Sequence, residues 1–267
     1  MMAELTLGTV GGLTERLRAR CAPMERRWAR LWTTPPHGSP HGAFEADAEA
    51  RSISLPQLES VLTGEPLAPL LPPTLHRCVR ARQLAFLGGR LSAEAAIRQL
   101  GLPSQSVPRG PMGEPAWPHG VVGSITHTDF HAHAMVLPQD AGASIGIDSE
   151  TVVSPSAARD IALVCCTPWE RAHWLGGKDD VLVMTQLFCV KEAFYKAAHP
   201  LVQRFIDFDE VEVIGRDAEA GEFFLQPLST GLLSRRLCAA RTVIEFVGAV
   251  RYVHASVVIP THPTLSP

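Results

Sequence analysis

One helical segment, residues 186–197, constrains the fold of this chain more than any other part of the sequence. It consists of good helix formers and contains neither glycine nor proline. The first such residue after it is Pro200. Its apolar residues recur every three or four positions, at Leu187, Val190, Phe194 and Ala197. This spacing predicts an α-helix with one face in a hydrophobic core.

Two charged residues of this segment, Glu192 and Lys196, are one helical turn apart at the edge of the apolar face. A carboxylate and an ammonium held side by side could bind a metal ion and a phosphate. The alternative is an ordinary surface ion pair, which stabilises a helix by only a few tenths of a kcal/mol. A second acidic pair upstream favours the first interpretation.

That second pair is Asp148 and Glu150, at the end of the strand-like segment 144–150. Alternation along a strand places both carboxylates on the same face. Two full charges about 4 Å apart repel each other by about 4 kcal/mol at an effective dielectric constant of 20. A cation between them would relieve this repulsion, whereas at a solvated strand end solvent would largely screen it.

The composition limits the classes of function. The chain has 267 residues, 46% of them hydrophobic, so it can bury a large core in one domain or two. Its 24 basic and 27 acidic residues give a formal net charge of -3. This charge argues against a positive potential over the whole surface that would bind nucleic acid or anionic membranes. Any anion must therefore be bound by a local site.

The six cysteines show no C-x-x-C pattern, which fits reduced thiols in a cytoplasm. The first thirty residues contain no apolar signal region, and no apolar run approaches 18 residues. We therefore expect a soluble, cytoplasmic protein.

The remaining pattern predicts a mixture of helices and antiparallel strands. Helices are expected over 13–31, 75–100, 156–165 and 168–175, and strands over 121–127, 132–137, 144–150, 211–214, 223–226, 241–250 and 254–259. The sequence Thr167-Pro168-Trp169-Glu170 is a strong helix start, with an N-cap threonine, a first-position proline and a third-position glutamate.

The helix over 75–100, which the pair Gly88-Gly89 could interrupt, has five arginines and one glutamate on its outer face. The arginines are Arg77, Arg80, Arg82, Arg90 and Arg98. A solvated helix face explains them, but so many guanidinium groups could also bind a phosphate.

Three motifs, in this order, resemble those of the 4'-phosphopantetheinyl transferases, and more narrowly the Sfp/enterobactin-synthetase-D-like group. They are Gly123-Ser124-Ile125-Thr126-His127, Gly146-Ile147-Asp148-Ser149-Glu150, and Phe188-Cys189-Val190-Lys191-Glu192-Ala193-Phe194-Tyr195-Lys196. The arginine-rich helix with Gly89-Arg90 and the loop Pro115-x-Trp117-Pro118 also resemble that group. The resemblance covers roughly residues 75 to 200.

The resemblance implies an α+β fold with small antiparallel sheets, built as two similar halves related by a pseudo-twofold axis. The halves would be residues 1–142 and 143–267, with coenzyme A in the cleft between them. Because such a chain already contains both halves of its cleft, a monomer is expected.

The resemblance also implies the reaction. A serine hydroxyl of an apo acyl or peptidyl carrier protein would attack the β-phosphate of coenzyme A, as in a holo-[acyl-carrier-protein] synthase, and adenosine 3',5'-bisphosphate would leave. Asp148, Glu150 and Glu192 would bind Mg²⁺, a hard cation that prefers carboxylate oxygens. Glu192 would be the base, directly or through a water, and Lys196 would contact the phosphates and stabilise the leaving group.

By the same resemblance, a set of mostly basic residues would contact coenzyme A. These are Arg82, Arg90, Arg109, Thr126, His127, Lys191 and Lys196. Lys191 lies about 100° around the helix from Glu192, which separates it from the line of Glu192 and Lys196.

Four positions depart from the family pattern. The family commonly has Trp where this chain has Phe188, and Ser where it has Cys189 and Thr126. It commonly has an apolar residue where this chain has Ser149. Since no metal ligand is lost, we expect altered packing and carrier preference with activity retained. The resemblance to this group suggests clients in secondary metabolism, in polyketide, nonribosomal peptide or siderophore biosynthesis.

Three other interpretations remain. A catalytically inactive module that binds coenzyme A or a carrier protein should have lost part of the acidic triad or Lys196, yet all four residues are present. A zinc site could use His119, His127, His131 and His133. Cys165 or Cys189 could be a nucleophile, although neither has an obvious histidine partner.

Overall fold

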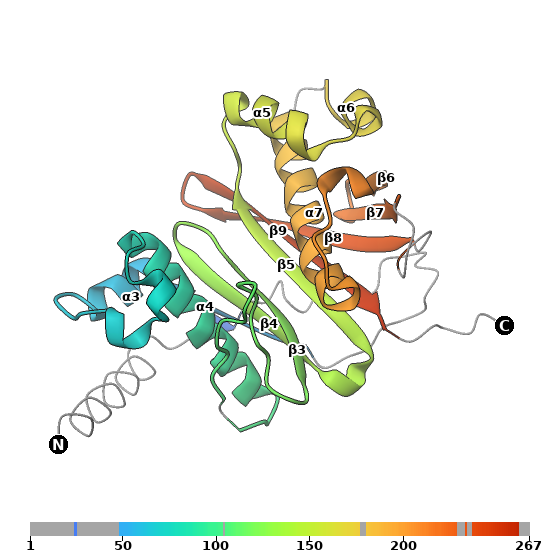
Figure 1. Cartoon of the computed structure of the whole chain (residues 1–267). Helices are drawn as coiled ribbons and strands as arrows, with labels where there is room; N and C mark the ends of the chain where they lie inside the picture. The colour runs from blue at the N-terminus through green and yellow to red at the C-terminus, as the bar shows by residue number, and fades with distance from the viewer. Residues whose placement is uncertain are drawn as a thin grey trace, which may run out of the picture. The chain divides into compact units, whose positions relative to one another are not determined.

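A computed structural model describes residues 24–25, 48–103, 105–176, 180–228, 233 and 237–261. Within these residues it contains five α-helices, α3 to α7, and nine strands in two antiparallel sheets (Figure 1). The predicted α+β class is confirmed. The pseudo-twofold relation stays a prediction.

The described residues divide into two compact units that interleave in the sequence. The first contains residues 24–25, 49–118 and 125–136, and the second contains residues 119–124 and those from 137 onward. The division passes through the strands β3 (Val121–His127) and β4 (His131–Pro138). The predicted halves 1–142 and 143–267 stay a prediction.

The first unit packs one long helix against a small sheet of order β1-β2-β4-β3. Its other elements are β1 (Met24–Glu25), β2 (Glu49–Ser54), α3 (Leu55–Val61), two 3-10 turns at Ala68–Leu70 and Pro73–Leu75, and α4 (Arg80–Gln99). Gly88 and Gly89 do not interrupt α4. A Cβ on Gly88 would lie 2.8 Å from Leu55 Cδ2, and one on Gly89 would lie 2.7 Å from Ile125 Cγ2, so both glycines allow the helix to pack closely.

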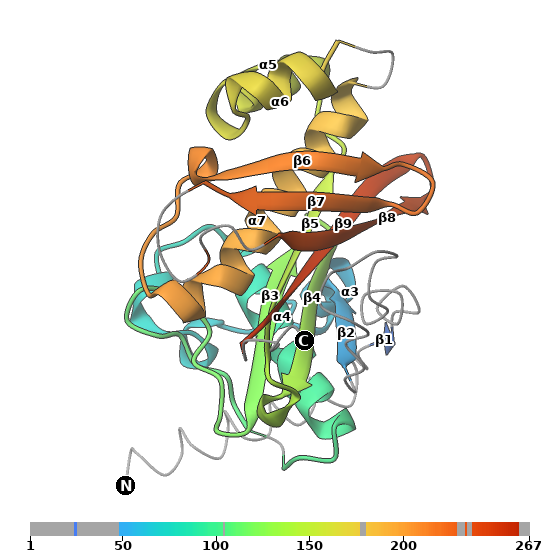
Figure 2. The same cartoon turned by 90° about the vertical axis from the view of Figure 1, so that its right-hand side faces the viewer.

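The second unit packs helices against a sheet of order β5-β9-β8-β7-β6. Its elements are a 3-10 turn at Gln139–Ala141, β5 (Ala143–Thr151), α5 (Pro155–Cys165), α6 (Pro168–Trp174), α7 (Asp180–Val202), a 3-10 turn at Phe208–Glu210, β6 (Val211–Asp217), β7 (Glu222–Pro227), β8 (Cys238–Val247) and β9 (Val250–Pro260). Figure 1 shows α7 lying along β5, and Figure 2 shows β6, β7 and β8 side by side.

The predicted core face of residues 186–197 is confirmed. Leu187, Val190, Phe194 and Ala197 of α7 are each at most 1% exposed. They pack in one cluster with inward residues of β9, among them Val253, Ala255 and Val257. The helix is longer than predicted, because it continues through Pro200 to Val202.

A glycine determines how closely α7 approaches the sheet. A Cβ on Gly146 of β5 would lie 1.9 Å from the Ala193 carbonyl oxygen and 2.5 Å from the Ala197 nitrogen. Two positions earlier, Ser144 Oγ donates a hydrogen bond of 2.7 Å to the Ala197 carbonyl oxygen. The helix backbone therefore rests directly on the strand at Gly146.

Some elements differ from the prediction. The strand expected over 241–250 ends at Val247, because Gly248 adopts the left-handed φ of 62° and turns the chain into β9. Neither β2 nor α3 was predicted. Of the helix expected over 13–31, only Met24–Glu25 are described, and they form a strand.

We expect Gly146→Ala to lower the free energy of unfolding by about 3 kcal/mol or more, because the added methyl meets backbone atoms that cannot move aside. Urea denaturation measures this. Gly215→Ala is the control, since its nearest neighbour would be a side-chain atom of Phe224 at 3.2 Å. A Gly146→Ala variant within about 0.5 kcal/mol of the parent would contradict direct packing of α7 on β5.

Candidate functional site

The first candidate site lies where α7 crosses β5 in the second unit. Asp148 and Glu150 pair in register with Ala255 and Val253, two core residues on the α7 side of the sheet. Both carboxylates therefore belong to the α7 face, as the alternation predicted. Lys196 of α7 reaches this face, where its Nζ donates a hydrogen bond of 2.6 Å to Asp148 Oδ1.

The charges at this site act on one another. Burial opposes the charged form of Lys196, but attraction to Asp148, and then to Glu192, outweighs it and raises the pKa of Lys196. Burial and repulsion by Asp148 raise the pKa of Glu192, and Lys196 only partly offsets this. Asp148, Glu192 and Lys196 thus form one electrostatic cluster, and Glu192 accepts a proton more readily than an ordinary glutamate.

The carboxylates fit Mg²⁺ by their chemistry, because they are hard oxygen donors whose mutual repulsion a cation would relieve. They do not form a preassembled site. Within the described part of the chain, no group of three or more His, Cys, Asp or Glu side chains is placed to hold a metal ion. Lys196 instead occupies one oxygen of Asp148.

The structure does not support Lys191 as a coenzyme A ligand. Its ammonium is fully buried and donates three hydrogen bonds, to Glu170 Oε2 at 2.7 Å, to the Cys165 carbonyl at 2.8 Å and to the Phe208 carbonyl at 2.9 Å. These bonds use all three of its donors. The 100° rotation from Glu192 places Lys191 in the core of the second unit.

Glu170, the partner of Lys191, is also fully buried. As predicted, it closes a capping box with Thr167 at the start of α6. Its Oε1 additionally accepts a hydrogen bond of 2.7 Å from the Val213 backbone nitrogen. The sequence indicated the cap, but no local pattern indicated that Glu170 pairs with a lysine 21 residues away.

The second candidate site lies in the first unit and is basic. Arg82 Nη1 donates a hydrogen bond of 2.8 Å to His127 Nε2. Burial, followed by repulsion from Arg109 and Arg82, lowers the pKa of Arg90 to about 10. The structure thus brings together four of the predicted coenzyme A contacts, while Thr126, next to His127 on β3, is buried.

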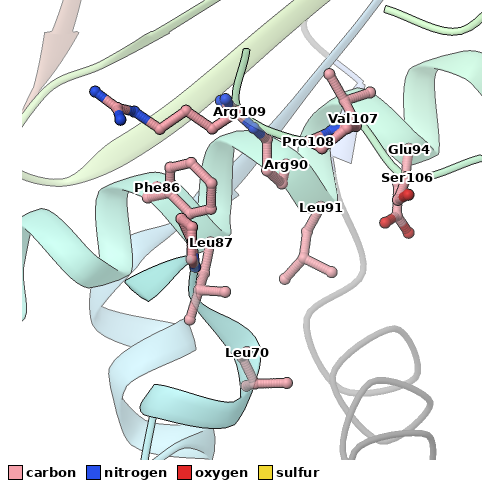
Figure 3. Close-up of a pocket in the computed structure, with 11 residues that line it drawn as sticks. Leu70, Phe86, Leu87, Arg90, Leu91, Glu94, Ser106, Val107, Pro108 and Arg109 are labelled. Carbon is pink, nitrogen blue, oxygen red and sulfur yellow. The ribbon is translucent and has the colours of Figure 1, made fainter. Parts of the chain in front are cut away.

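Arg90 and Arg109 line a cavity of about 300 Å³ in this unit (Figure 3). The rest of its lining is mostly apolar and comes from α4, the preceding turns and residues 106–108: Leu70, Pro72, Phe86, Leu87, Leu91, Glu94, Ser106, Val107 and Pro108. The Arg90 guanidinium lies 4.3 Å from the centre of the Phe86 ring. Its buried Nε has no hydrogen-bond partner among the described residues, so an anion could bind there.

A wider hollow of about 660 Å³ lies on the Arg82 side of α4. His127 and Asp129 line it together with Arg80, whose Nε donates to Glu59 at 2.6 Å. Arg80 is thereby paired with a carboxylate. Arg82 and His127 are the basic groups of this hollow that the resemblance assigns to coenzyme A.

The structure gives no support to a thiol nucleophile. Cys189 is fully buried, and burial, with the charges of Asp148 and Glu150, raises the pKa of its thiol well above the usual value. A hydrogen bond with Cys166 and burial likewise raise the pKa of Cys165. Both thiols therefore stay protonated near neutral pH.

Of the histidines considered for zinc, His131 and His133 stack with ring centres 5.9 Å apart.

Comparisons with known proteins agree with these motifs. A model of the 4'-phosphopantetheinyl transferase N-terminal domain matches residues 68–137, and a model of the 4'-phosphopantetheinyl transferase superfamily matches residues 144–241. The chain is 37% identical over 174 residues to 4'-phosphopantetheinyl transferase Svp of Streptomyces mobaraensis, a match covering 62% of this chain and 69% of Svp. The chain belongs to the 4'-phosphopantetheinyl transferase family.

Two other relatives match over shorter segments. 4'-Phosphopantetheinyl transferase Npt of Nocardia iowensis is 39% identical over 141 residues, which are 52% of this chain and 62% of Npt. Enterobactin synthase component D of Escherichia coli K12 is 33% identical over 142 residues, 52% of this chain and 65% of that protein. The chain thus spans less than two thirds of the length of these two family members.

Among its described helices, none combines the length and apolarity needed to cross a bilayer.

We expect Lys191→Met to destabilise the protein by about 3 to 5 kcal/mol, because it leaves the Glu170 carboxylate buried without its counter-charge. The double variant Lys191→Met/Glu170→Gln should recover part of this loss, since it removes the stranded charge. Urea denaturation of both variants measures the effect. If Lys191→Met kept full stability and only weakened coenzyme A binding, the buried-pair interpretation would be wrong.

Glu192→Gln should make the protein more stable than the parent at pH 7. Because the pKa of Glu192 is raised from its ordinary value of 4.5, the ionised carboxylate destabilises the folded state at pH values above 4.5. The amide of glutamine carries no charge and removes this cost. The gain should shrink as pH falls and vanish below that value, where Glu192 is protonated in both states. Melting temperatures between pH 4 and 8 test this, with exposed Glu219→Gln as control. A constant difference across this range would contradict it.

Proposed function

We propose that this protein transfers the 4'-phosphopantetheine group of coenzyme A to a serine of an apo acyl or peptidyl carrier protein in a Mg²⁺-dependent reaction. Adenosine 3',5'-bisphosphate would be the second product. The observation that carries the proposal is the cluster of Asp148, Glu192 and Lys196 at the α7–β5 crossing of a chain in this family. The cluster combines a lysine with carboxylates, one of which has a raised pKa.

Asp148, Glu150 and Glu192 would hold Mg²⁺, which would neutralise pyrophosphate charge and polarise the attacked phosphate. Glu192 would take the proton of the serine hydroxyl, directly or through a water. Its raised pKa suits this role, because a general base works best when its pKa approaches the working pH. Lys196 would stay charged throughout and stabilise the negative charge on the leaving bisphosphate.

Coenzyme A would be held in part by the basic cluster of the first unit. Its phosphates would contact Arg82, Arg90, Arg109 and His127, and Thr126 would keep a hydroxyl group where the family commonly has Ser. The buried Nε of Arg90 and the mutual repulsion of the guanidinium groups support an anionic ligand there. The apolar lining beside Arg90 suits an uncharged, flat part of the same molecule.

A module that only binds coenzyme A or a carrier protein is the alternative. Such a module has no need for a base with a raised pKa or for a lysine next to acidic groups.

The proposed clients are carrier proteins of secondary metabolism, in polyketide, nonribosomal peptide or siderophore pathways. One relative is named as a component of enterobactin synthase. We propose that the protein works in the cytoplasm as a monomer.

The deciding experiment is the intact mass of an apo carrier protein incubated with this protein, coenzyme A and Mg²⁺. We expect a gain of one phosphopantetheine group, lost with a chelator and slowed at least about 100-fold by Glu192→Gln, since general base catalysis contributes 10²- to 10⁴-fold. Glu219→Gln, an exposed glutamate far along the sequence, should behave like the parent.

Absence of transfer to carriers of several types, with coenzyme A binding intact in calorimetry, would replace the enzyme by the binding module. Transfer that persists at full rate in Glu192→Gln would keep the enzyme but remove Glu192 as its base.

A further inference from the structure

Three polar side chains form a hydrogen-bonded chain across neighbouring strands of the second unit. Ser149 Oγ of β5 lies 2.9 Å from His254 Nδ1 of β9. On the other side of the ring, His254 Nε2 lies 3.1 Å from Glu245 Oε2 of β8. Ser149 and His254 are at most 1% exposed. We call these three residues the Ser149 relay.

The two contacts of His254 limit the proton positions in the relay. An ionised Glu245 only accepts hydrogen bonds, so His254 Nε2 carries the proton that it donates. The bond between Nδ1 and Ser149 Oγ takes its direction from the tautomer of the ring, and the serine hydroxyl can either donate or accept. All three groups are satisfied in this arrangement. Ser149 and His254 are too deeply buried for a substrate to reach, so the relay is not a hydrolytic triad.

The relay lies directly behind the acidic site. Asp148 and Glu150 belong to the α7 face of β5, so Ser149 between them points to the opposite face. In register Ser149 pairs with His254, and β9 pairs in turn with β8. The relay therefore ties the one residue between the two carboxylates to β9 and, through His254, to β8.

This tie matters because β5 is the outermost strand of its five-stranded sheet. Within that sheet it has a ladder of backbone hydrogen bonds on one side only, to β9. One further restraint on its free edge is the hydrogen bond of 3.0 Å from the Ile147 nitrogen to Ser124 Oγ. The side chains of the relay therefore add restraint to a strand whose backbone is paired within its sheet on one side only.

We propose that Ser149, His254 and Glu245 are positioning residues that fix the centre of β5 and so limit the movement of Asp148 and Glu150, the strand carboxylates of the proposed metal site. This inference rests on the proposed function, which assigns the metal to these carboxylates. It also gives a role to Ser149, where the family commonly has an apolar residue.

The test is binding of Mn²⁺, used as a paramagnetic substitute for Mg²⁺, measured by electron paramagnetic resonance of the full chain without substrates. Ser149→Ala and Glu245→Ala should each weaken Mn²⁺ binding about tenfold, the lower end of the effect of losing a residue that orients a ligand. Glu245→Gln keeps an acceptor for His254 Nε2 and should bind nearly as the parent does. Ser256→Ala is the matched control, because Ser256 is a buried serine on the same face of β9, paired with Ile147.

Melting temperatures separate positioning from a merely structural role. If Ser149→Ala and Glu245→Ala lower the melting temperature but bind Mn²⁺ as tightly as Ser256→Ala does, the inference is overturned while the proposed site stands. If the parent binds no Mn²⁺, or if Asp148→Asn binds it equally well, the proposed metal site fails and the inference fails with it.

Discussion

The direct packing of α7 on β5 is the constraint on which the second unit depends. It requires a glycine at position 146, because any side chain there would overlap the helix backbone. The bond from Ser144 to the Ala197 carbonyl fixes the same crossing one helical turn beyond Ala193. Since Asp148 follows Gly146 on the same face, this crossing brings the strand carboxylate within hydrogen-bonding distance of Lys196. The acidic cluster is thus a consequence of a helix that lies unusually close to its sheet.

A second interaction holds the other side of α7. Lys191 points away from the cluster and joins the end of α5, the start of α6 and the turn before β6 through Glu170 and two backbone carbonyls. Replacing such a buried pair by apolar residues can be neutral or stabilising, so its net contribution to stability need not be large. The pair also restricts the rotation of α7, because Lys191 must stay within hydrogen-bonding distance of Glu170. That rotation is also the one that presents Glu192 and Lys196 to β5.

The sequence predicted these features wherever the pattern was local. Periodicity located the buried face of α7, alternation placed Asp148 and Glu150 together, and capping chemistry located the start of α6. The pairing of Lys191 with Glu170 and of Ser149 with His254 could not be predicted, because each joins residues 21 or 105 positions apart whose own neighbours give no signal. Gly88 and Gly89 suggested a helix break by propensity, whereas tertiary packing uses them for close contact.

Both candidate sites bring like charges together, although Lys196 partly offsets the carboxylates of the second. In the first unit, burial and then repulsion by Arg109 and Arg82 lower the pKa of Arg90, and in the second, burial and then repulsion by Asp148 raise the pKa of Glu192. Both shifts combine burial with repulsion that persists in the folded protein, and such shifts concentrate at functional sites. An anionic ligand would relieve the first and a cation the second. The proposed function would supply both kinds of charge, an anionic phosphate group and a magnesium cation, to a chain whose net charge is modest.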